Sequence, residues 1–278
     1  MTFVLAVIEL NFDPFLRLGE LAVRWQTIGI TLALLAALAL ATLIAARQRP
    51  NQLRLSDIVL IAAGVVPGAV SGGRLVHAID FWDTYAAQPI LILNPSAGTL
   101  SLLGAVLGGF LSGAYVARLE GAPVFRWADA AAVPLLLAIG LGKLAQLLGG
   151  SGQGLPYEGQ WAVAFGGLGP WISANPLMPS HPSQVYEGLW ALLGIPMVVL
   201  WSVGQRVPAG RLFVGALSWF LIGRVLVGFT WRDDRIVGPF NTEQALALAA
   251  FVAMSLVVVL SRPRYRGHMQ PRAEERLP

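Results

Sequence analysis

The stretch TIGITLALLAALALATLIAA, residues 27–46, carries no charged side chain over twenty positions. At a rise of about 1.5 Å per residue, a helix of this length spans roughly 30 Å, which matches the hydrocarbon core of a bilayer. The stretch therefore predicts a transmembrane helix. Six further, mostly apolar stretches of comparable length follow along the chain, at residues 57–79, 98–118, 129–149, 185–203, 210–230 and 242–260.

The composition agrees with a membrane protein. Of the 278 residues, 56% are hydrophobic and 12% are charged, whereas a soluble domain has roughly 25% charged residues. Lipid offers no hydrogen-bond partner to a bare backbone amide, so the spans must be helical. We therefore expect an all-α polytopic membrane protein, with a single membrane domain over residues 1–278 and seven transmembrane helices.

The basic residues of the loops predict the orientation. Loops on one side of the predicted spans, together with the tail at 261–278, carry twelve basic residues, and those on the other side carry four. Because basic loops stay in the cytoplasm, we expect the N-terminus outside and the C-terminus in the cytoplasm. The longest outer loop, residues 150–184, is rich in glycine and proline and has one charged residue, Glu158. This loop either borders a substrate entrance or is a plain connector.

The residue counts exclude several kinds of chemistry. The chain has no cysteine, which excludes a disulfide, a thiolate metal site and a cysteine nucleophile. The three histidines, His77, His181 and His268, lie far apart in sequence and show no metal-ligand spacing, so we expect no metal and no cofactor. The net charge is +4, but the basic residues are spread over the loops as orientation signals. We therefore expect no nucleic-acid partner.

Three basic residues lie inside the predicted spans, namely Arg74, Lys143 and Arg224. A charge at the centre of a span costs about 2.5–3.5 kcal/mol on insertion scales, so charged residues there usually have a function. Cations that converge in an apolar cavity suit an anionic head group, above all a lipid phosphate. The alternatives are snorkelling toward an interface and a structural ion pair with Asp57, Asp80 or Glu187.

The segment HPSQVYE, residues 181–187, opens the fifth predicted span. Pro182 fits the first turn of a helix, where its missing N–H would have no partner in any case. Gln184, Tyr186 and Glu187 then enter the membrane, where polar groups need partners. His181 acts either as a base at the interface or as a structural residue at the helix start.

The spacing of small and aromatic residues predicts how the helices pack and where they end. Small residues four positions apart let helix backbones approach closely. Such series occur in the second and third spans, at Gly64, Gly68 and Gly72 and at Gly104 and Gly108. Tryptophans near the ends of spans, among them Trp231, are expected at the membrane interfaces.

Longer motifs give the chain a family resemblance. They are NFDPFLRLGELAVRW at 11–25, AGTLSLLGAVLGG at 97–109, GLGKLAQLLGGSGQG at 140–154, HPSQVYE at 181–187 and GRVLVGFTWRDD at 223–234. With these motifs the chain resembles bacterial prolipoprotein diacylglyceryl transferase over nearly its whole length. The resemblance implies a multi-pass protein of the bacterial cytoplasmic (inner) membrane. It also implies transfer of the diacylglyceryl group of phosphatidylglycerol to the lipobox cysteine of a prolipoprotein, with glycerol phosphate leaving.

Buried charge and position in the family motifs together suggest roles for single residues. Arg224, Lys143 and Arg74 are expected to bind, or to be organised around, the head group of phosphatidylglycerol or another anionic phospholipid. Gln146 is expected to hydrogen-bond the glycerol or the phosphate. Gly154 is expected to allow close approach of the outer loop.

The chain departs from the family at the position of its essential histidine, which is Leu103 here. Another residue must then act as the general base. His181 and Glu187 are the catalytic candidates, with His77 as a further possibility. Alternatively, the chain acts on a different lipid or acceptor, or binds anionic lipid without catalysis. A transporter would have two related halves, and the sequence contains no such half-repeat.

Overall fold

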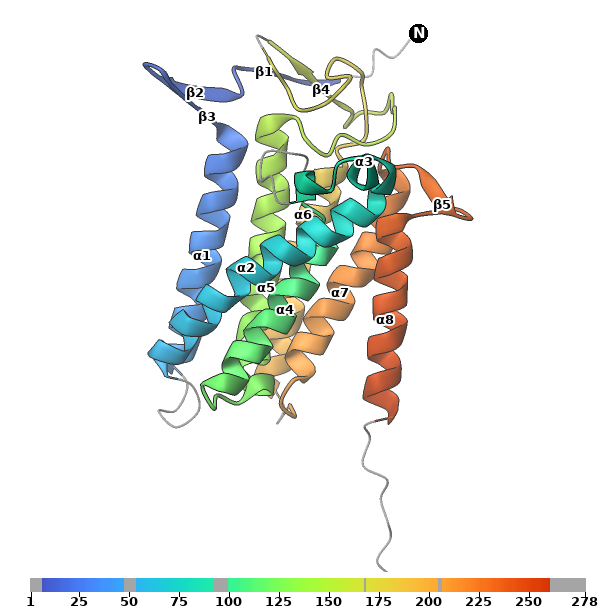
Figure 1. Ribbon diagram of the computed structural model, residues 1–278. Helices are drawn as coiled ribbons and strands as arrows, with labels where there is room; N and C mark the ends of the chain where they lie inside the picture. The colour runs from blue at the N-terminus through green and yellow to red at the C-terminus, as the bar shows by residue number, and fades with distance from the viewer. Residues whose placement is uncertain (1–6, 48–53, 93–99, 168, 205–206, 261–278) are drawn as a thin grey trace, which may run out of the picture.

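The computed structural model describes residues 7–47, 54–92, 100–167, 169–204 and 207–260. In this part of the chain, seven helices are long and apolar enough to cross a membrane, and they lie together in one bundle (Figure 1). The predicted all-α fold with seven membrane spans is confirmed. The predicted basic tail at 261–278 lies outside the described residues. The long helices are α1 (Trp25–Arg47), α2 (Leu55–Asp80), α4 (Leu102–Leu119), α5 (Val124–Gln146), α6 (Ser183–Gly204), α7 (Arg211–Val227) and α8 (Thr242–Leu260).

Six of the seven long helices begin one to five residues away from the predicted starts, and α8 begins at the predicted residue, Thr242. α5 begins at Val124, directly after Pro123, whereas the apolar stretch starts at residue 129. A helix can start before its apolar stretch, because a long charged side chain such as Arg126 can extend from the first turn toward the membrane surface. α4 begins at Leu102, where the Ser101 hydroxyl caps the helix by accepting a hydrogen bond from the Gly104 N–H at 3.1 Å.

The two glycine series lie where α2 packs along α4. A Cβ atom placed on Gly72 would lie 2.4 Å from the carbonyl oxygen of Gly104, and one placed on Gly108 would lie 2.3 Å from the carbonyl oxygen of Gly68. Any side chain at these positions would collide with the backbone of the neighbouring helix. The glycines therefore permit the close helix contact expected from their spacing.

One end of the bundle carries three small two-stranded sheets, which the sequence did not predict (Figure 1). Strand β1 (Ile8–Asn11) pairs in parallel with β4 (Val163–Gly166) and so ties the start of the described chain to the predicted outer loop. The hairpin of β2 (Phe15–Leu18) and β3 (Leu21–Arg24) leads directly into α1, and the hairpin of β5 (Arg235–Val237) and β6 (Phe240–Asn241) leads directly into α8. Strands of two to four residues are too short to show the alternation that identifies a strand in a sequence.

Short helices complete this end of the bundle. They are α3 (Trp82–Ala87) and the 3-10 turns η1 (Pro89–Ile92), η2 (Leu147–Gly149) and η3 (Gly228–Thr230). The last two continue α5 and α7 as tighter turns, which is a common way for an α-helix to end. The short helices and the described residues between η2 and α6 lie at the same end of the bundle as the three sheets (Figure 1).

The orientation in the membrane is a prediction that single cysteines can test, because the chain contains none of its own. Glu158 lies in the 150–184 segment, and Glu120 lies between α4 and α5 at the other end of the bundle; both are exposed. We expect Glu158→Cys to react with a membrane-impermeant maleimide in intact cells, and Glu120→Cys to react only after lysis. The reverse pattern would place the C-terminal end of α8 outside and contradict the predicted orientation.

Candidate functional site

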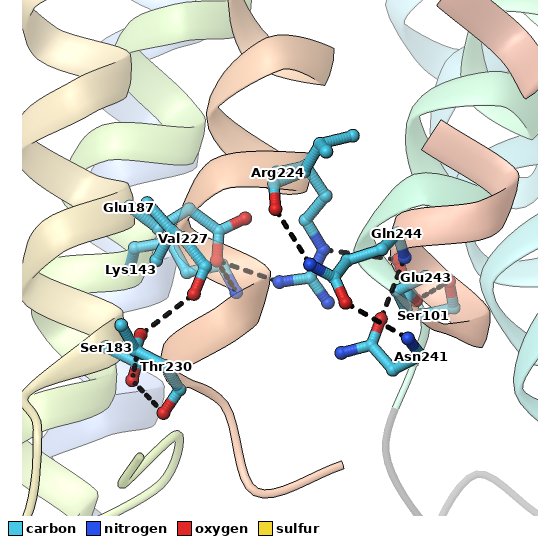
Figure 2. Close-up of polar contacts among 11 residues, drawn as sticks. Ser101, Lys143, Ser183, Glu187, Arg224, Val227, Thr230, Asn241, Glu243 and Gln244 are labelled. Carbon is cyan, nitrogen blue, oxygen red and sulfur yellow. Dashed lines mark hydrogen bonds and ion pairs between the residues drawn. The ribbon is translucent and has the colours of Figure 1, made fainter. Parts of the chain in front are cut away.

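Two of the three membrane-embedded cations meet at one carboxylate (Figure 2). Lys143 Nζ and Arg224 Nη1 each lie 2.9 Å from the same oxygen, Oε2 of Glu187. All three side chains are buried, and Glu187 is only 1% exposed. The residues come from α5, α6 and α7, so the ion pairs join three spans in the interior of the bundle.

The three charges lie close to one end of the membrane-spanning bundle. Lys143 is three residues from the end of α5, Glu187 is four residues into α6, and Arg224 is three residues from the end of α7. At about 1.5 Å per residue, each lies roughly 5 Å inside its helix end. This is the end that carries the small sheets and the 150–184 segment. The cations therefore lie near one end of the predicted membrane spans.

Arg224 also contacts a second carboxylate. Its Nε lies 3.4 Å from Oε2 of Glu243, in the first turn of α8. The other carboxylate oxygen, Oε1 of Glu243, accepts a hydrogen bond from the Ser101 hydroxyl at the start of α4. The guanidinium therefore links α6 and α7 to α8, and Glu243 links α8 to α4 (Figure 2). Two cations face two carboxylates in this cluster, and the buried charges balance.

Glu243 was missed by the sequence analysis because an acidic residue is common in the first turn of a helix. There it complements the positive end of the helix dipole and needs no other partner. The signal that it carries a further role is its place inside a predicted span, at 242–260, where a charge requires a partner. The reasoning that singled out Arg74, Lys143 and Arg224 applies equally to this carboxylate.

Trp231 lies against the two cations and not only at a membrane interface. The centre of its ring is 4.5 Å from Lys143 Nζ and 5.2 Å from Arg224 Cζ. An aromatic face attracts cations, more strongly when water is excluded. The backbone of Trp231 bridges to Gly154, and a Cβ atom on Gly152 would lie 2.9 Å from the indole ring. The 150–184 segment thus packs against the ring that covers the cations.

Arg74 has a different set of partners. It is buried on α2, and its Nε and Nη2 atoms donate to the carbonyl oxygens of Ile92 and Leu91 in η1, at 3.2 and 2.8 Å. Its guanidinium also lies 6.0 Å from the ring centre of Tyr85 in α3. Of the three predicted cations, the structure therefore brings Lys143 and Arg224 together, while Arg74 holds η1 against α2.

Gln146 and Gly154 both lie next to this cluster. Gln146 is three residues beyond Lys143 on α5, and its side-chain oxygen is buried without a hydrogen-bond partner among the described residues. At Gly154 the N–H donates to the His181 carbonyl at 2.8 Å, and a Cβ atom would lie 2.1 Å from Ser183 Oγ and 2.4 Å from Thr230 O. The segment passes so close to the start of α6 and the end of η3 that only glycine fits.

Comparison with known proteins places the chain in a family. The model of the prolipoprotein diacylglyceryl transferase family matches residues 14–260. The chain belongs to the prolipoprotein diacylglyceryl transferase family. Three relatives named phosphatidylglycerol–prolipoprotein diacylglyceryl transferase are similar along most of their length. The one from Geobacter sulfurreducens is 31% identical over 264 residues, which is 91% of this chain and 96% of the relative. Those from Bacillus cereus and Trichormus variabilis are 28% and 26% identical, over 93% and 89% of this chain and 94% and 89% of the relatives.

Membership of this transferase family confirms the resemblance drawn from the motifs and makes the protein a transferase by type. The matched residues 14–260 include all seven spans and the whole ionic cluster. Lys143, Glu187 and Arg224 therefore lie on a scaffold that relatives named for diacylglyceryl transfer share.

The two candidate bases have different surroundings on this transferase scaffold. The His181 ring stacks on Tyr157 with a centroid distance of 4.1 Å, and its Nδ1 lies 3.2 Å from Tyr186 Oη. Burial lowers the pKa of the His181 imidazole, so the neutral form that can accept a proton prevails near neutral pH. Glu187 instead bridges two cations, and a proton on its carboxylate would weaken both attractions. Its geometry suits holding Lys143 and Arg224 in place.

Leu103 is the residue expected from the motifs at the position of the family's histidine. It is fully buried in the apolar core, one residue into α4 and close to Ser101 in sequence. Its alkyl side chain accepts no proton.

Proposed function

We propose that this protein transfers the diacylglyceryl group of phosphatidylglycerol to the lipobox cysteine of a prolipoprotein in the bacterial cytoplasmic membrane. The observation that carries the proposal is the pair of cations at one carboxylate, Lys143 and Arg224 at Glu187, buried near one end of the membrane-spanning bundle. The family membership and the names of the relatives support the same reaction.

The reaction requires positive charge near the departing phosphate, and this cluster provides two cations. The cysteine sulfur forms a bond to the glycerol carbon of the diacylglyceryl group, and the bond from that carbon to a phosphate oxygen breaks. Negative charge grows on the phosphate of the departing glycerol phosphate. Cations that are already in place stabilise such charge in a site from which water is excluded. Lys143 and Arg224 supply them, and Glu187 holds the two groups side by side before the lipid binds.

The thiol must also lose its proton. Of the candidate acceptors His181, Glu187 and His77, His181 in its neutral form is favoured, because Glu187 is engaged with two cations. General-base assistance is worth about 10² to 10⁴-fold in rate. With Leu103 at the family's histidine position, we propose that the proton leaves by another route than in relatives that have the histidine.

A second candidate function is binding of anionic lipid without transfer, and the observation that favours it is the buried, apolar Leu103. The test is the purified protein in detergent with phosphatidylglycerol and a lipobox peptide, with the Geobacter sulfurreducens relative assayed in parallel. A thioether-linked peptide in the mass spectrum supports transfer. If only the relative forms the product while this protein retains phosphatidylglycerol, the second function holds.

A further inference from the structure

Arg224 makes two unequal contacts with the carboxylates of the ionic cluster (Figure 2). Its Nη1 lies 2.9 Å from Glu187 Oε2, the oxygen that Lys143 also binds at 2.9 Å. Its Nε lies 3.4 Å from Glu243 Oε2, and both of these atoms are buried without a hydrogen-bond partner among the described residues. The contact with Glu243 is therefore an ion pair without a hydrogen bond, and it is the weaker of the two.

The cluster as a whole offers no net positive charge to an anion. The two cations, Lys143 and Arg224, are balanced by the two carboxylates, Glu187 and Glu243. A lipid phosphodiester carries one negative charge, so its arrival would leave one negative charge uncompensated in a buried place. Burying an uncompensated charge is strongly unfavourable. Binding of the phosphate is therefore favoured if one of the two carboxylates loses its charge at the same time.

The other charged groups around Glu243 add mainly negative charge. Asp80, at the end of α2, and Asp233, between η3 and β5, both interact electrostatically with Glu243. His77, three residues before Asp80, adds an imidazole. From the other elements of the cluster, Lys143 and Arg224 face the same carboxylate. The surroundings therefore do not supply a further fixed cation for the phosphate, and they favour a proton on one of the carboxylates.

Glu243 can give up its charge with a smaller loss of contacts than Glu187. A proton on Glu187 would weaken two ion pairs at 2.9 Å, whereas a proton on Glu243 would weaken one contact at 3.4 Å. The other oxygen of Glu243, Oε1, accepts a hydrogen bond from the Ser101 hydroxyl. A hydroxyl can bond a carboxylic acid as well as a carboxylate, so this contact with α4 can persist after protonation.

We propose that the lipid phosphate displaces Glu243 from Arg224 and that Glu243 takes up one proton as it is displaced. In the lipid-free protein the Glu243 carboxylate occupies the place at Nε that a phosphate oxygen takes when the lipid binds. The proton comes from the solvent, and the cluster is then neutral again, with two cations facing Glu187 and the phosphate. This inference rests on the proposed function and adds to it a coupling between lipid binding and proton uptake.

The test counts the protons that are taken up when the lipid binds, without any turnover. A short-chain phosphatidylglycerol is titrated into the full-length protein in detergent by isothermal titration calorimetry, in buffers of equal pH and different ionisation enthalpy. The dependence of the observed heat on the buffer gives the number of protons. We expect the wild type to take up about one proton per lipid, and its affinity to fall about tenfold for each unit that the pH rises over the range of this uptake.

The variant that tests the role of Glu243 is Glu243→Gln. Its amide has nearly the shape of a protonated carboxyl group but cannot gain a proton. It should bind the lipid without proton uptake and with an affinity that no longer depends on pH. At high pH it should bind more tightly than the wild type, because no carboxylate has to be neutralised. The matched control is Glu120→Gln, at an exposed position between α4 and α5, which should behave like the wild type.

A wild type that binds the lipid without taking up a proton overturns the proposal. So does a Glu243→Gln variant with unchanged proton uptake, since the proton then goes to another group such as His77. Should Glu243→Gln fail to fold, Ser101→Ala is expected to shift the pH dependence of the affinity toward higher pH, because it removes a hydrogen bond that stabilises the charged carboxylate. An unshifted dependence also overturns the proposal.

These outcomes can be told apart from a failure of the proposed function. Protons are counted on binding, so the result does not depend on whether a thioether forms. A wild type that binds no phosphatidylglycerol at all contradicts the proposed function, and this inference with it.

Discussion

Glu187→Gln is expected to lower the free energy of unfolding by about 3–5 kcal/mol, the cost of leaving a buried charge without its partner. In the wild type, Lys143 and Arg224 share the Glu187 carboxylate, and Arg224 also contacts Glu243. The amide of glutamine has nearly the same shape as the carboxylate but no charge. Two buried cations would then face one carboxylate, which is 3.4 Å from Arg224.

The measurement is thermal unfolding of the purified protein in detergent, followed by the fluorescence of its nine tryptophans. The exposed Glu120→Gln serves as control and should unfold like the wild type. The double variant Lys143→Gln/Glu187→Gln removes one charge of each sign and leaves Arg224 with Glu243. It should recover at least half of the stability lost in Glu187→Gln. If the double variant is no more stable than the single one, charge balance is not the reason for the loss.

The membrane spans and the buried charges could be predicted from the sequence, because both depend on local composition. The spans could be predicted because a run of about twenty apolar residues is the length that a membrane-crossing helix requires and exceeds what a buried core helix needs. Lys143 and Arg224 could be singled out because a charge inside a span is costly, and Glu187 was among the three carboxylates named as possible partners. These inferences require only that a residue be in the membrane, which its neighbours in the sequence reveal.

The contact partners of Arg74 and Trp231 could not be predicted, because nothing in the sequence marks these partners. Arg74 looked like the other two cations, but its partners include backbone carbonyls of η1, and any residue type supplies a carbonyl. Trp231 had the position expected of an interface tryptophan, and nothing in the sequence distinguishes a ring that faces lipid from one that covers two cations.

Arg224→Gln is expected to reduce the rate of diacylglyceryl transfer by about 10² to 10³-fold, the usual loss when one group that stabilises developing negative charge is removed. The planar guanidinium of Arg224 contacts two carboxylates at once, because Nη1 binds Glu187 and Nε faces Glu243. Arg224→Lys keeps the charge but has no fork, so it should restore only part of the rate. Lys143→Arg keeps the charge and adds a fork, and it should stay within about tenfold of the wild type.

The rate to compare is that of thioether formation from phosphatidylglycerol and a lipobox peptide, normalised to the amount of folded protein, because Arg224→Gln also leaves Glu243 without its cation. Arg211→Gln is the matched control. It makes the same substitution in the same helix at the opposite end, where the side chain is exposed, and transfer should be unaffected. A transfer rate for Arg224→Gln within tenfold of the wild type would mean that the phosphate leaves from another place. The cation pair at Glu187 would then serve the fold, as a buried ion pair that joins three helices and has no part in the reaction.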